Sequence, residues 1–229
     1  MPEVSRPNLL CHREVQSMSE SAAPVQAPAT SVAALLWPSR SGRIGAVRAV
    51  LLAIAGACLL TISAKVQVPG PVPMTLQTLA VLGLGAALGL RLAVASVGLY
   101  LLQGALGLPV FANTPPLAPG LAYFAGPTGG FLAGFLLSAA IVGAAADRGL
   151  MRRPGTFAVV LAGANAALLA CGWVWLALAA TVGTGSGVGF GRAFALGVQP
   201  FLLGEAIKVA LAALAFPLVY RALAHLVRR

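Results

Sequence analysis

The stretch Ile44–Ala64, I-G-A-V-R-A-V-L-L-A-I-A-G-A-C-L-L-T-I-S-A, contains one charged side chain, Arg48, in 21 residues. A run of about 20 apolar residues is the length that an α-helix needs to cross the hydrocarbon core of a bilayer. The stretch therefore predicts a transmembrane helix. Similar apolar segments recur about every 30 residues toward the C-terminus, so several further transmembrane helices are expected.

Working outward from this helix, the hydropathy pattern predicts an all-α, polytopic membrane protein built as a bundle of six transmembrane helices. The expected spans are about 44–64, 73–90, 92–110, 128–146, 157–182 and a last one from Pro200 past Pro217. Residues 44–229 then form one membrane domain. Residues 1–43 are polar and rich in Pro, Ser and Ala, and we expect a disordered cytoplasmic tail there, with no cleaved signal.

The composition supports the membrane interpretation. Of 229 residues, 59% are hydrophobic and 9% charged, against roughly 45–50% and 25% in soluble domains. The net charge is +10, but the basic residues separate long apolar runs instead of clustering on a polar face, so no nucleic-acid partner is expected. Three distant cysteines offer neither a disulfide framework nor a metal knuckle.

The positions of Lys and Arg predict the orientation, because cytoplasmic loops are enriched in them. With the N-terminus inside, ten flanking basic residues are cytoplasmic and only Lys65 and Arg192 are outside. Both termini are therefore expected in the cytoplasm and the protein in the inner (cytoplasmic) membrane. The glycine-alternating run 183–191 is then an exterior loop, and it lacks the Lys-[Ser/Thr] of a phosphate-binding loop.

Several chemistries are disfavoured by residue counts. The two lysines, Lys65 and Lys208, do not follow a glycine, so no ATP-binding loop exists and the protein cannot by itself energise a process with ATP. The two histidines, His12 and His225, flank the bundle, which disfavours an intramembrane enzyme or a metal site. We expect a protein that is not an enzyme and that carries no cofactor.

The pair Glu205 and Lys208, near the outer end of the last helix, is the most informative local feature. Three residues apart, the two side chains share nearly one helix face. Burying each charge costs about 2.5–3.5 kcal/mol on insertion scales. Either the pair satisfies itself and sets helix packing, or it faces a ligand; the second interpretation is favoured because an apolar pair would cost the bundle less.

Further polar residues are expected in the same outer half of the bundle. They are Gln77, Tyr100, Asn113, Tyr123, Thr128 and Asn165. For Tyr100 and Asn165, a hydrogen bond between helices is an equal alternative to a ligand contact. The loop 109–130 is either a lid over the site or a rigid connector.

Small residues at four-residue spacing form two rows, at Ala49, Ala53 and Ala57 and at Gly130, Gly134 and Ser138. Such rows let another helix approach closely. Internal packing explains both rows, and the first could alternatively serve an external partner.

Four stretches together resemble the BioY family, the biotin-specific S-components of energy-coupling-factor transporters. They are V-P-M-T-L-Q-T-L (72–79), L-G-L-P-V-F-A (106–112), G-L-A-Y-F-A-G-P-T-G-G-F (120–131) and Q-P-F-L-L-G-E-A-I-K (199–208). They occur in family order and leave only the N-terminal tail outside the resemblance.

The resemblance implies a six-helix S-component that captures biotin from outside and works with ATPase subunits and a transmembrane coupling subunit. The family's G-D-x-x-K motif contacts the polar head of the ligand, and here it corresponds to Glu205, with glutamate for aspartate, and Lys208. A polar residue after L-P-V-F corresponds to Asn113, although the sequence after it departs from the Gly-rich family version. The family's Ala-x-x-x-Ala docking surface corresponds to Ala49, Ala53 and Ala57.

A ureido ring has two N–H donors and one carbonyl acceptor, which complement a carboxylate beside an ammonium. We therefore expect Glu205 to accept from the ureido N–H groups and Lys208 to donate to a carbonyl or carboxylate oxygen. The alternatives are a self-sufficient channel or facilitator for another small solute and, less favoured, an intramembrane enzyme.

Overall fold

The structure is a computed structural model that describes residues 31–33, 42–68, 74–114, 120–182 and 185–227. Six long helices carry the bundle: α3 (Arg43–Lys65), α4 (Gln77–Leu88), α5 (Leu90–Ala105), α7 (Gly129–Asp147), α8 (Pro154–Leu178) and α10 (Leu202–Val227). Each is the counterpart of one predicted span. The all-α bundle is therefore confirmed for the part of the chain that is described.

Short elements connect the long helices. They are the antiparallel pairs β1 (Gln67–Val68) with β2 (Met74–Thr75) and β3 (Thr181–Val182) with β4 (Gly185–Ser186), the helices α6 (Leu121–Ala125) and α9 (Phe190–Gly197), and the 3-10 turns η1 (Leu150–Arg152) and η2 (Gln199–Phe201). The sequence analysis missed α6 and α9. It also predicted a loop where β4 and the start of α9 lie.

Helix lengths differ from the predicted spans in three places. The helix α8 ends at Leu178, before the predicted end at Val182, because Thr181 and Val182 pair in β3. Among the described residues, four stretches are long and apolar enough to cross a membrane, namely α3, α7, α8 and the segment Phe190–Leu226 that includes α10. The helices α4 and α5 have 12 and 16 residues. Their predicted spans were too long because Met74 and Thr75 pair in β2 and because α5 ends at Ala105, before Leu106 and Gly107.

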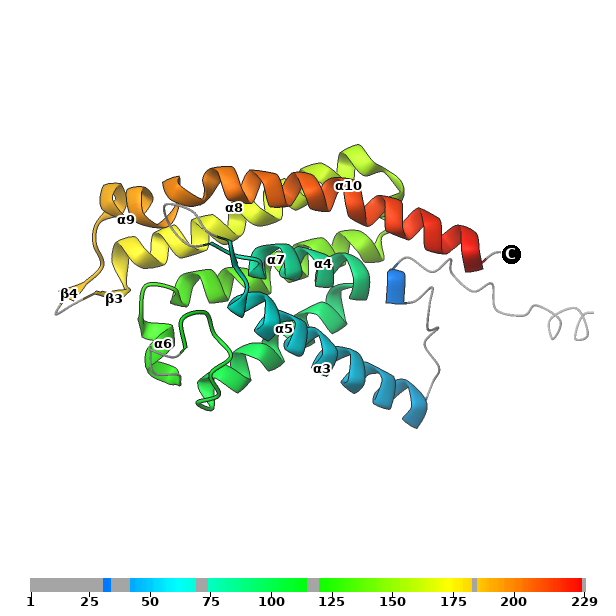
Figure 1. Cartoon of the computed structure of the whole chain (residues 1–229), viewed down its shortest axis with the longest axis horizontal. Helices are drawn as coiled ribbons and strands as arrows, with labels where there is room; N and C mark the ends of the chain where they lie inside the picture. The colour runs from blue at the N-terminus through cyan, green and yellow to red at the C-terminus, as the bar shows by residue number, and fades with distance from the viewer. Residues whose placement is uncertain (1–30, 34–41, 69–73, 115–119, 183–184, 228–229) are drawn as a thin grey trace, which may run out of the picture.

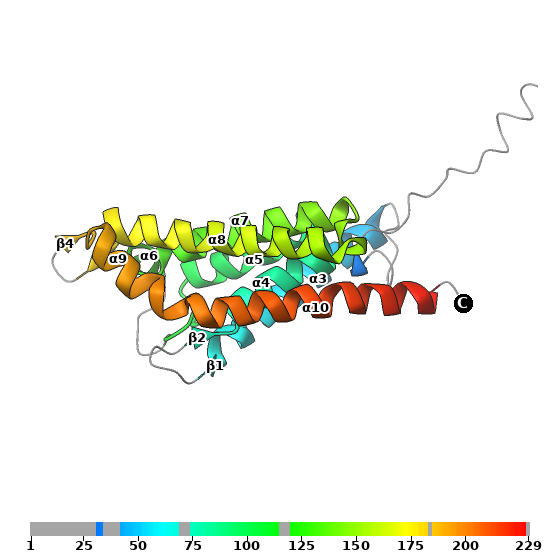
Figure 2. The same cartoon turned by 90° about the horizontal axis from the view of Figure 1, so that it is seen from above.

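The elements are distributed unevenly along the bundle. Figure 1 shows α6, α9 and the β3–β4 pair at one end, and the start of α3 and the end of α10 at the other. Figure 2, seen from above, shows β1 and β2 close to the first turns of α10. We call the first end the α6 end and the opposite one, where η1 connects α7 to α8, the η1 end.

The helix α7 lies at the centre of the bundle and contacts α4, α5 and α8. Its predicted row of small residues is confirmed as an internal packing surface. A Cβ atom added at Gly134 would lie 2.9 Å from the carbonyl oxygen of Leu168 on α8, and one at Gly130 would collide with Trp175 of the same helix. The absence of side chains at these glycines lets α7 and α8 approach closely.

The buried side chains form two main clusters. The α6-end cluster includes the aromatic residues Tyr100, Phe111, Tyr123 and Phe135. The η1-end cluster, which includes Leu82, Met151 and Phe157, is mainly aliphatic. The polar cavity described below lies beside the first cluster.

Part of the predicted disordered tail contacts the bundle. Val32 packs against the η1-end cluster, and Nη2 of Arg48 on α3 donates a hydrogen bond of 2.9 Å to the carbonyl oxygen of Ala33. Residues 31–33 are thus packed against the bundle, and Gly42 and Arg43, also within the predicted tail, are the N-cap and the first residue of α3. The other residues of the predicted tail, 1–30 and 34–41, lie outside the described residues.

Candidate substrate-binding site

A cavity of about 430 Å³ opens at the α6 end. Its walls come from β2, α4, α5, the segment 111–113, α6, α7, α8, α9, η2 and α10. Ligand pockets in proteins typically enclose about 300–1,000 Å³. The cavity thus has the size of a site for a small molecule, and residues far apart in the sequence are needed to build it.

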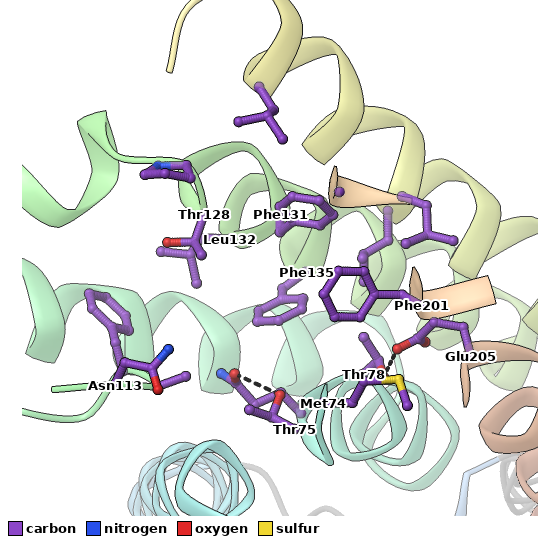
Figure 3. Close-up of a pocket in the computed structure, with 18 of the residues that line it drawn as sticks. Met74, Thr75, Thr78, Asn113, Thr128, Phe131, Leu132, Phe135, Phe201 and Glu205 are labelled. Carbon is purple, nitrogen blue, oxygen red and sulfur yellow. Dashed lines mark hydrogen bonds between the residues drawn. The ribbon is translucent and has the colours of Figure 1, made fainter. Parts of the chain in front are cut away.

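Most of the lining is apolar. Figure 3 shows the rings of Phe131, Phe135 and Phe201 and the side chain of Leu132 in the middle of the cavity, with Asn113 and Glu205 on opposite sides. The cavity therefore has polar groups toward both sides and an apolar body between them. That distribution suits a ligand with two polar ends joined by an apolar segment.

One side of the cavity holds the buried ion pair. Glu205 and Lys208 are 4% and 7% exposed, and Nζ of Lys208 lies 2.7 Å from Oε1 of Glu205. Both residues lie on α10, one helical turn apart, as their spacing predicts. The Cβ-free Gly204 beside them lets Met74 of β2 approach, because an added Cβ would lie 2.6 Å from Cε of Met74.

Thr78 of α4 completes the ion-pair network. Its Oγ1 donates to Oε1 of Glu205 over 3.0 Å and accepts from Nζ of Lys208 over 3.0 Å. Nζ of Lys208 also donates to the carbonyl oxygen of Thr75 over 2.8 Å. The three N–H donors of this ammonium therefore have three protein acceptors.

The two partners of the ion pair differ in what they offer to a ligand. Oε2 of Glu205 is buried and has no hydrogen-bond partner among the described residues. A buried carboxylate oxygen without a donor is rare and costly. Glu205 lines the cavity, and its Oε2 lacks a donor among the described residues, whereas the three donors of Lys208 are taken up by Glu205, Thr75 and Thr78. Lys208 thus fixes and charge-balances the carboxylate, and the roles of both residues toward a ligand stay predictions.

Gln77 and Tyr100 line the cavity and also bond to each other. Nε2 of Gln77 donates to the Tyr100 hydroxyl over 2.7 Å, and Oγ1 of Thr75 donates to Oε1 of Gln77 over 3.1 Å. The Tyr100 hydroxyl in turn donates to the carbonyl oxygen of Val110 over 3.4 Å. Tyr100 therefore joins two other segments by hydrogen bonds and also lines the cavity, and its contact with a ligand stays a prediction.

Asn113 lies on the side of the cavity opposite Glu205 (Figure 3). Its φ of 58° is in the left-handed region, which asparagine tolerates better than most residues. Its Oδ1 accepts a hydrogen bond of 3.0 Å from Nε2 of Gln67. The side-chain N–H₂ of Asn113 remains as a donor group at the cavity wall.

Tyr123 and Thr128 line the cavity next to Asn113. The Tyr123 hydroxyl donates to the carbonyl oxygen of Ala112 over 2.8 Å, and its ring stacks on Phe111 at a centroid distance of 4.6 Å. Burial raises the pKa of Tyr123 above its ordinary value of 10, so its hydroxyl stays a donor at neutral pH. Thr128 precedes the first turn of α7 and makes no side-chain cap bond there.

Asn165 is the exception among the eight predicted ligand-contacting residues, because it does not line the cavity. Leu168 and Leu169, one turn further along α8, form the wall at this place. Asn165 is 6% exposed, and its Oδ1 has no hydrogen-bond partner in the described part of the chain. Asn165 therefore lies on the helix face that lines the cavity, but one turn further from the α6 end than the cavity wall.

The residues of the predicted docking row on α3 differ in burial. Ala57 is fully buried in the α6-end cluster and packs inside the bundle, whereas Ala49 and Ala53 are half-buried. The neighbouring Gly56 packs against Ser96 of α5. The exposed face of α3 carries larger side chains such as Val50, Leu51 and Ile54, and docking of a partner at Ala49 and Ala53 stays a prediction.

The sequence analysis did not identify Thr78, Met74 or Phe201 as site residues. Within the predicted span 73–90, Thr78 follows Thr75 by three residues, a helical spacing that could have indicated it, although Thr75 lies in β2 in the structure. Nothing in the local sequence indicates Met74 or Phe201, because they reach the cavity only through the pairing of β2 and the turn η2. Among the residues that the structure describes, no cluster of His, Cys, Asp and Glu could hold a metal ion.

Comparisons with known proteins agree with this architecture. The BioY family model matches residues 30–225. A probable biotin transporter BioY of Pyrococcus horikoshii is 36% identical over 155 residues, covering 67% of this chain and 85% of the relative. The biotin transporter BioY of Thermotoga maritima is 35% identical over 157 residues, covering 68% and 86% of the two chains.

The fold is shared with a solved structure. The crystal structure of the S-component for biotin from an ECF-type ABC transporter superposes with a TM-score of 0.63 at 20% identity, covering 80% of this chain and 95% of that one. The relatives are named as transporters, not as enzymes, and the apolar helices make this a multi-pass membrane protein. The chain belongs to the BioY family.

Proposed function

We propose that this protein is the substrate-capture component of a biotin uptake system in the cytoplasmic membrane. It binds biotin from the outside, and partner ATPase subunits with a transmembrane coupling subunit supply the energy for uptake. The names of the relatives and the S-component fold support the ligand and the class of transporter. The absence of an ATP-binding loop from the sequence is consistent with energy from a partner.

The observation that carries the proposal is the buried, unpartnered Oε2 of Glu205 at the cavity wall. The ureido ring of biotin offers N–H donors to such an oxygen, and a hydrogen bond to a charged acceptor is about twice as strong as a neutral one. Lys208 and Thr78 hold the carboxylate through Oε1, so Oε2 is oriented before the ligand arrives. Preorganisation of this kind reduces the entropic cost of binding.

The rest of the ligand matches the rest of the cavity. The thioether ring and the aliphatic chain would lie against Phe131, Phe135 and Phe201, which form the apolar part of the lining. The carboxylate of biotin would then reach the opposite side, where Asn113 and Thr128 offer an amide and a hydroxyl donor. The ligand is thereby oriented with its ureido head toward α10.

The orientation in the membrane follows from the basic residues. Lys65 ends α3 and Arg192 lies on α9, both toward the α6 end, while Arg148, Arg152 and Arg153 lie around η1. We infer that the η1 end is cytoplasmic, because cytoplasmic segments are enriched in Lys and Arg. The cavity then opens toward the outside, and both termini are cytoplasmic.

Isothermal titration with biotin tests the site directly. We expect Glu205→Gln to weaken binding by about 10- to 100-fold, the range for loss of a hydrogen bond to a charged group. Asp147→Asn is the matched control, because Asp147 is an exposed acid at the η1 end, far from the cavity. Equal affinity of Glu205→Gln and the unmodified protein would refute the assignment of Glu205.

Uptake of radiolabelled biotin tests the dependence on partners. In cells that express this protein with a coupling subunit and an ATPase, uptake should cease when the ATPase is inactivated by substitution. Unchanged uptake under those conditions would instead indicate a self-sufficient facilitator.

A further inference from the structure

The segment Val110–Thr114 forms the cavity wall opposite Glu205, and its backbone is held by side chains from three other elements. The Tyr100 hydroxyl of α5 bonds to the carbonyl oxygen of Val110, and the Tyr123 hydroxyl of α6 bonds to that of Ala112. The carbonyl between them, that of Phe111, accepts from Lys65 of α3 over 2.8 Å. Consecutive carbonyls of one segment are thus fixed from three directions.

Lys65 donates more hydrogen bonds to this segment than either tyrosine does. Besides the bond to Phe111, its Nζ donates to the carbonyl oxygen of Thr114 and, over 3.2 Å, to Oγ1 of Thr114. An ammonium has three donors, and all three go to this one segment. The bonds are charge-assisted, which makes them stronger than those from the two tyrosines. Thr114 is 2% exposed, so its end of the contact is protected from water.

The contacts of Lys65 lie on both sides of Asn113. Phe111 and Thr114 are fixed by Lys65, and Gln67, two residues after Lys65, donates to Oδ1 of Asn113. Asn113 itself has a left-handed φ of 58°, which asparagine tolerates better than most residues, and the bonds on both sides of it hold it in that conformation. The end of α3 and the start of β1 therefore determine both the backbone and the side-chain position of Asn113.

We propose that Lys65 is a positioning residue for the substrate. It holds the segment 110–114 closed against the cavity so that Asn113 and Phe111 face the ligand. Loss of its three bonds would let this wall move away and would shorten the lifetime of the bound ligand. The inference rests on the proposed function for the identity of the ligand, whereas the hold on the segment is a property of the protein alone.

Dissociation of labelled biotin from the purified protein in detergent measures the effect. We expect Lys65→Met to raise the dissociation rate about tenfold, with a smaller change in the association rate, because most affinity changes within one site are changes in dissociation. Lys65→Arg, which retains a charged donor, should restore most of the lifetime. Arg192→Met is the matched control, since Arg192 is an exposed cation at the same end of the bundle.

Hydrogen exchange without biotin tests the hold on the segment independently. In Lys65→Met, peptides that cover residues 108–114 should exchange faster than in the unmodified protein, and those from α8 should not change. Thr114→Val keeps the side-chain shape but removes one acceptor of Lys65 together with the hydrogen bond from the Thr114 hydroxyl to the carbonyl oxygen of Phe111, and it should give a weaker form of the same result. It also provides a second variant should Lys65→Met fail to fold.

A double-substitution cycle with Asn113→Ala separates positioning from a general loss of stability. If Lys65 acts through Asn113, Lys65→Met changes the biotin dissociation rate less in the Asn113→Ala background than alone. Additive effects, or unchanged exchange of the segment in both Lys65→Met and Thr114→Val, would overturn the role of Lys65. If the unmodified protein binds no biotin, the proposed function fails, and the exchange result alone decides whether Lys65 holds the segment.

Discussion

The two ends of the bundle share helices but differ in packing: the η1 end is filled with apolar side chains, and the α6 end contains a cavity. At the η1 end, Leu82, Met151 and Phe157 fill the space between α4, α7 and α8 with almost fully buried apolar side chains. At the α6 end, the same helices diverge around a cavity with the buried charges Glu205 and Lys208 at its wall. The comparison indicates that one end supplies stability and the other supports binding at a cost in stability. Buried charges are tolerated at the α6 end because Thr75 and Thr78 complete the bonds of Lys208.

The largest expected effect comes from breaking the ion pair. Lys208→Met leaves the buried carboxylate of Glu205 without its cation, and loss of one partner of a buried pair costs about 3–5 kcal/mol. The melting temperature in detergent should fall accordingly. Replacing both partners, as in Glu205→Leu with Lys208→Met, should recover most of the stability while abolishing biotin binding. A double variant as unstable as the single one would show that the pair itself stabilises the α6 end.

A matched pair of phenylalanine substitutions compares the two ends next. Phe157→Ala, in the filled η1-end cluster, should cost about 3–5 kcal/mol of stability and leave biotin affinity unchanged in the folded fraction. Phe135→Ala, at the cavity wall, should cost less because its ring already borders open space, and it should weaken biotin binding. Thermal unfolding and titration of both variants provide the measurement, and equal stability losses would contradict the contrast between the ends.

A smaller effect is expected from Tyr123→Phe. The substitution removes the hydrogen bond to the carbonyl oxygen of Ala112, worth about 1 kcal/mol. Because burial raises the pKa of Tyr123 above 10, the stability difference between the two proteins should be constant below pH 10. It should shrink as the pH rises from 10 to the raised pKa, because over that range Tyr123 loses its hydroxyl proton in the unfolded protein but keeps it in the folded one. Unfolding measured between pH 7 and 11 checks the sign, and a difference that grows above pH 10 would refute it.

The smallest effect should come from Asp147 at the η1 end. Its Oδ2 accepts a hydrogen bond of 2.9 Å from the backbone N–H of Leu90, the first residue of α5, and so acts as a cap supplied by another helix. Because the contact is exposed, Asp147→Ala should cost about 0.5 kcal/mol, the low end for loss of a cap. Biotin affinity should not change, and any loss of affinity would mean that the two ends are coupled.

The apolar pattern of the sequence was sufficient for the bundle, because a continuous apolar segment satisfies all its backbone hydrogen bonds within itself only as a helix and because the length of that helix is set by the thickness of the bilayer. The scarcity of acids likewise drew attention to Glu205, with Lys208 beside it at a helical spacing that fixes their proximity. Seven of the predicted site residues line the cavity, and most of them were indicated because a polar side chain near the end of an apolar span must have a polar partner. Asn113 was indicated by its place after the third predicted span and by the family resemblance.

Only the tertiary structure decided which polar groups have spare bonding capacity. Oε2 of Glu205 is open while Lys208 is saturated, because Thr75 and Thr78 come from β2 and α4, more than 120 residues earlier in the chain. Tertiary contacts also decided that Asn165 lies one helical turn away from the cavity and that Ala57 packs inside the bundle. They likewise bring Lys65 to its three acceptors, which lie 46 and 49 residues away in the sequence. The sequence by itself determined the helices and their polar residues, since these depend on local spacing and on the bilayer. The direction in which each donor and acceptor points depends on contacts between distant segments, which no local pattern encodes.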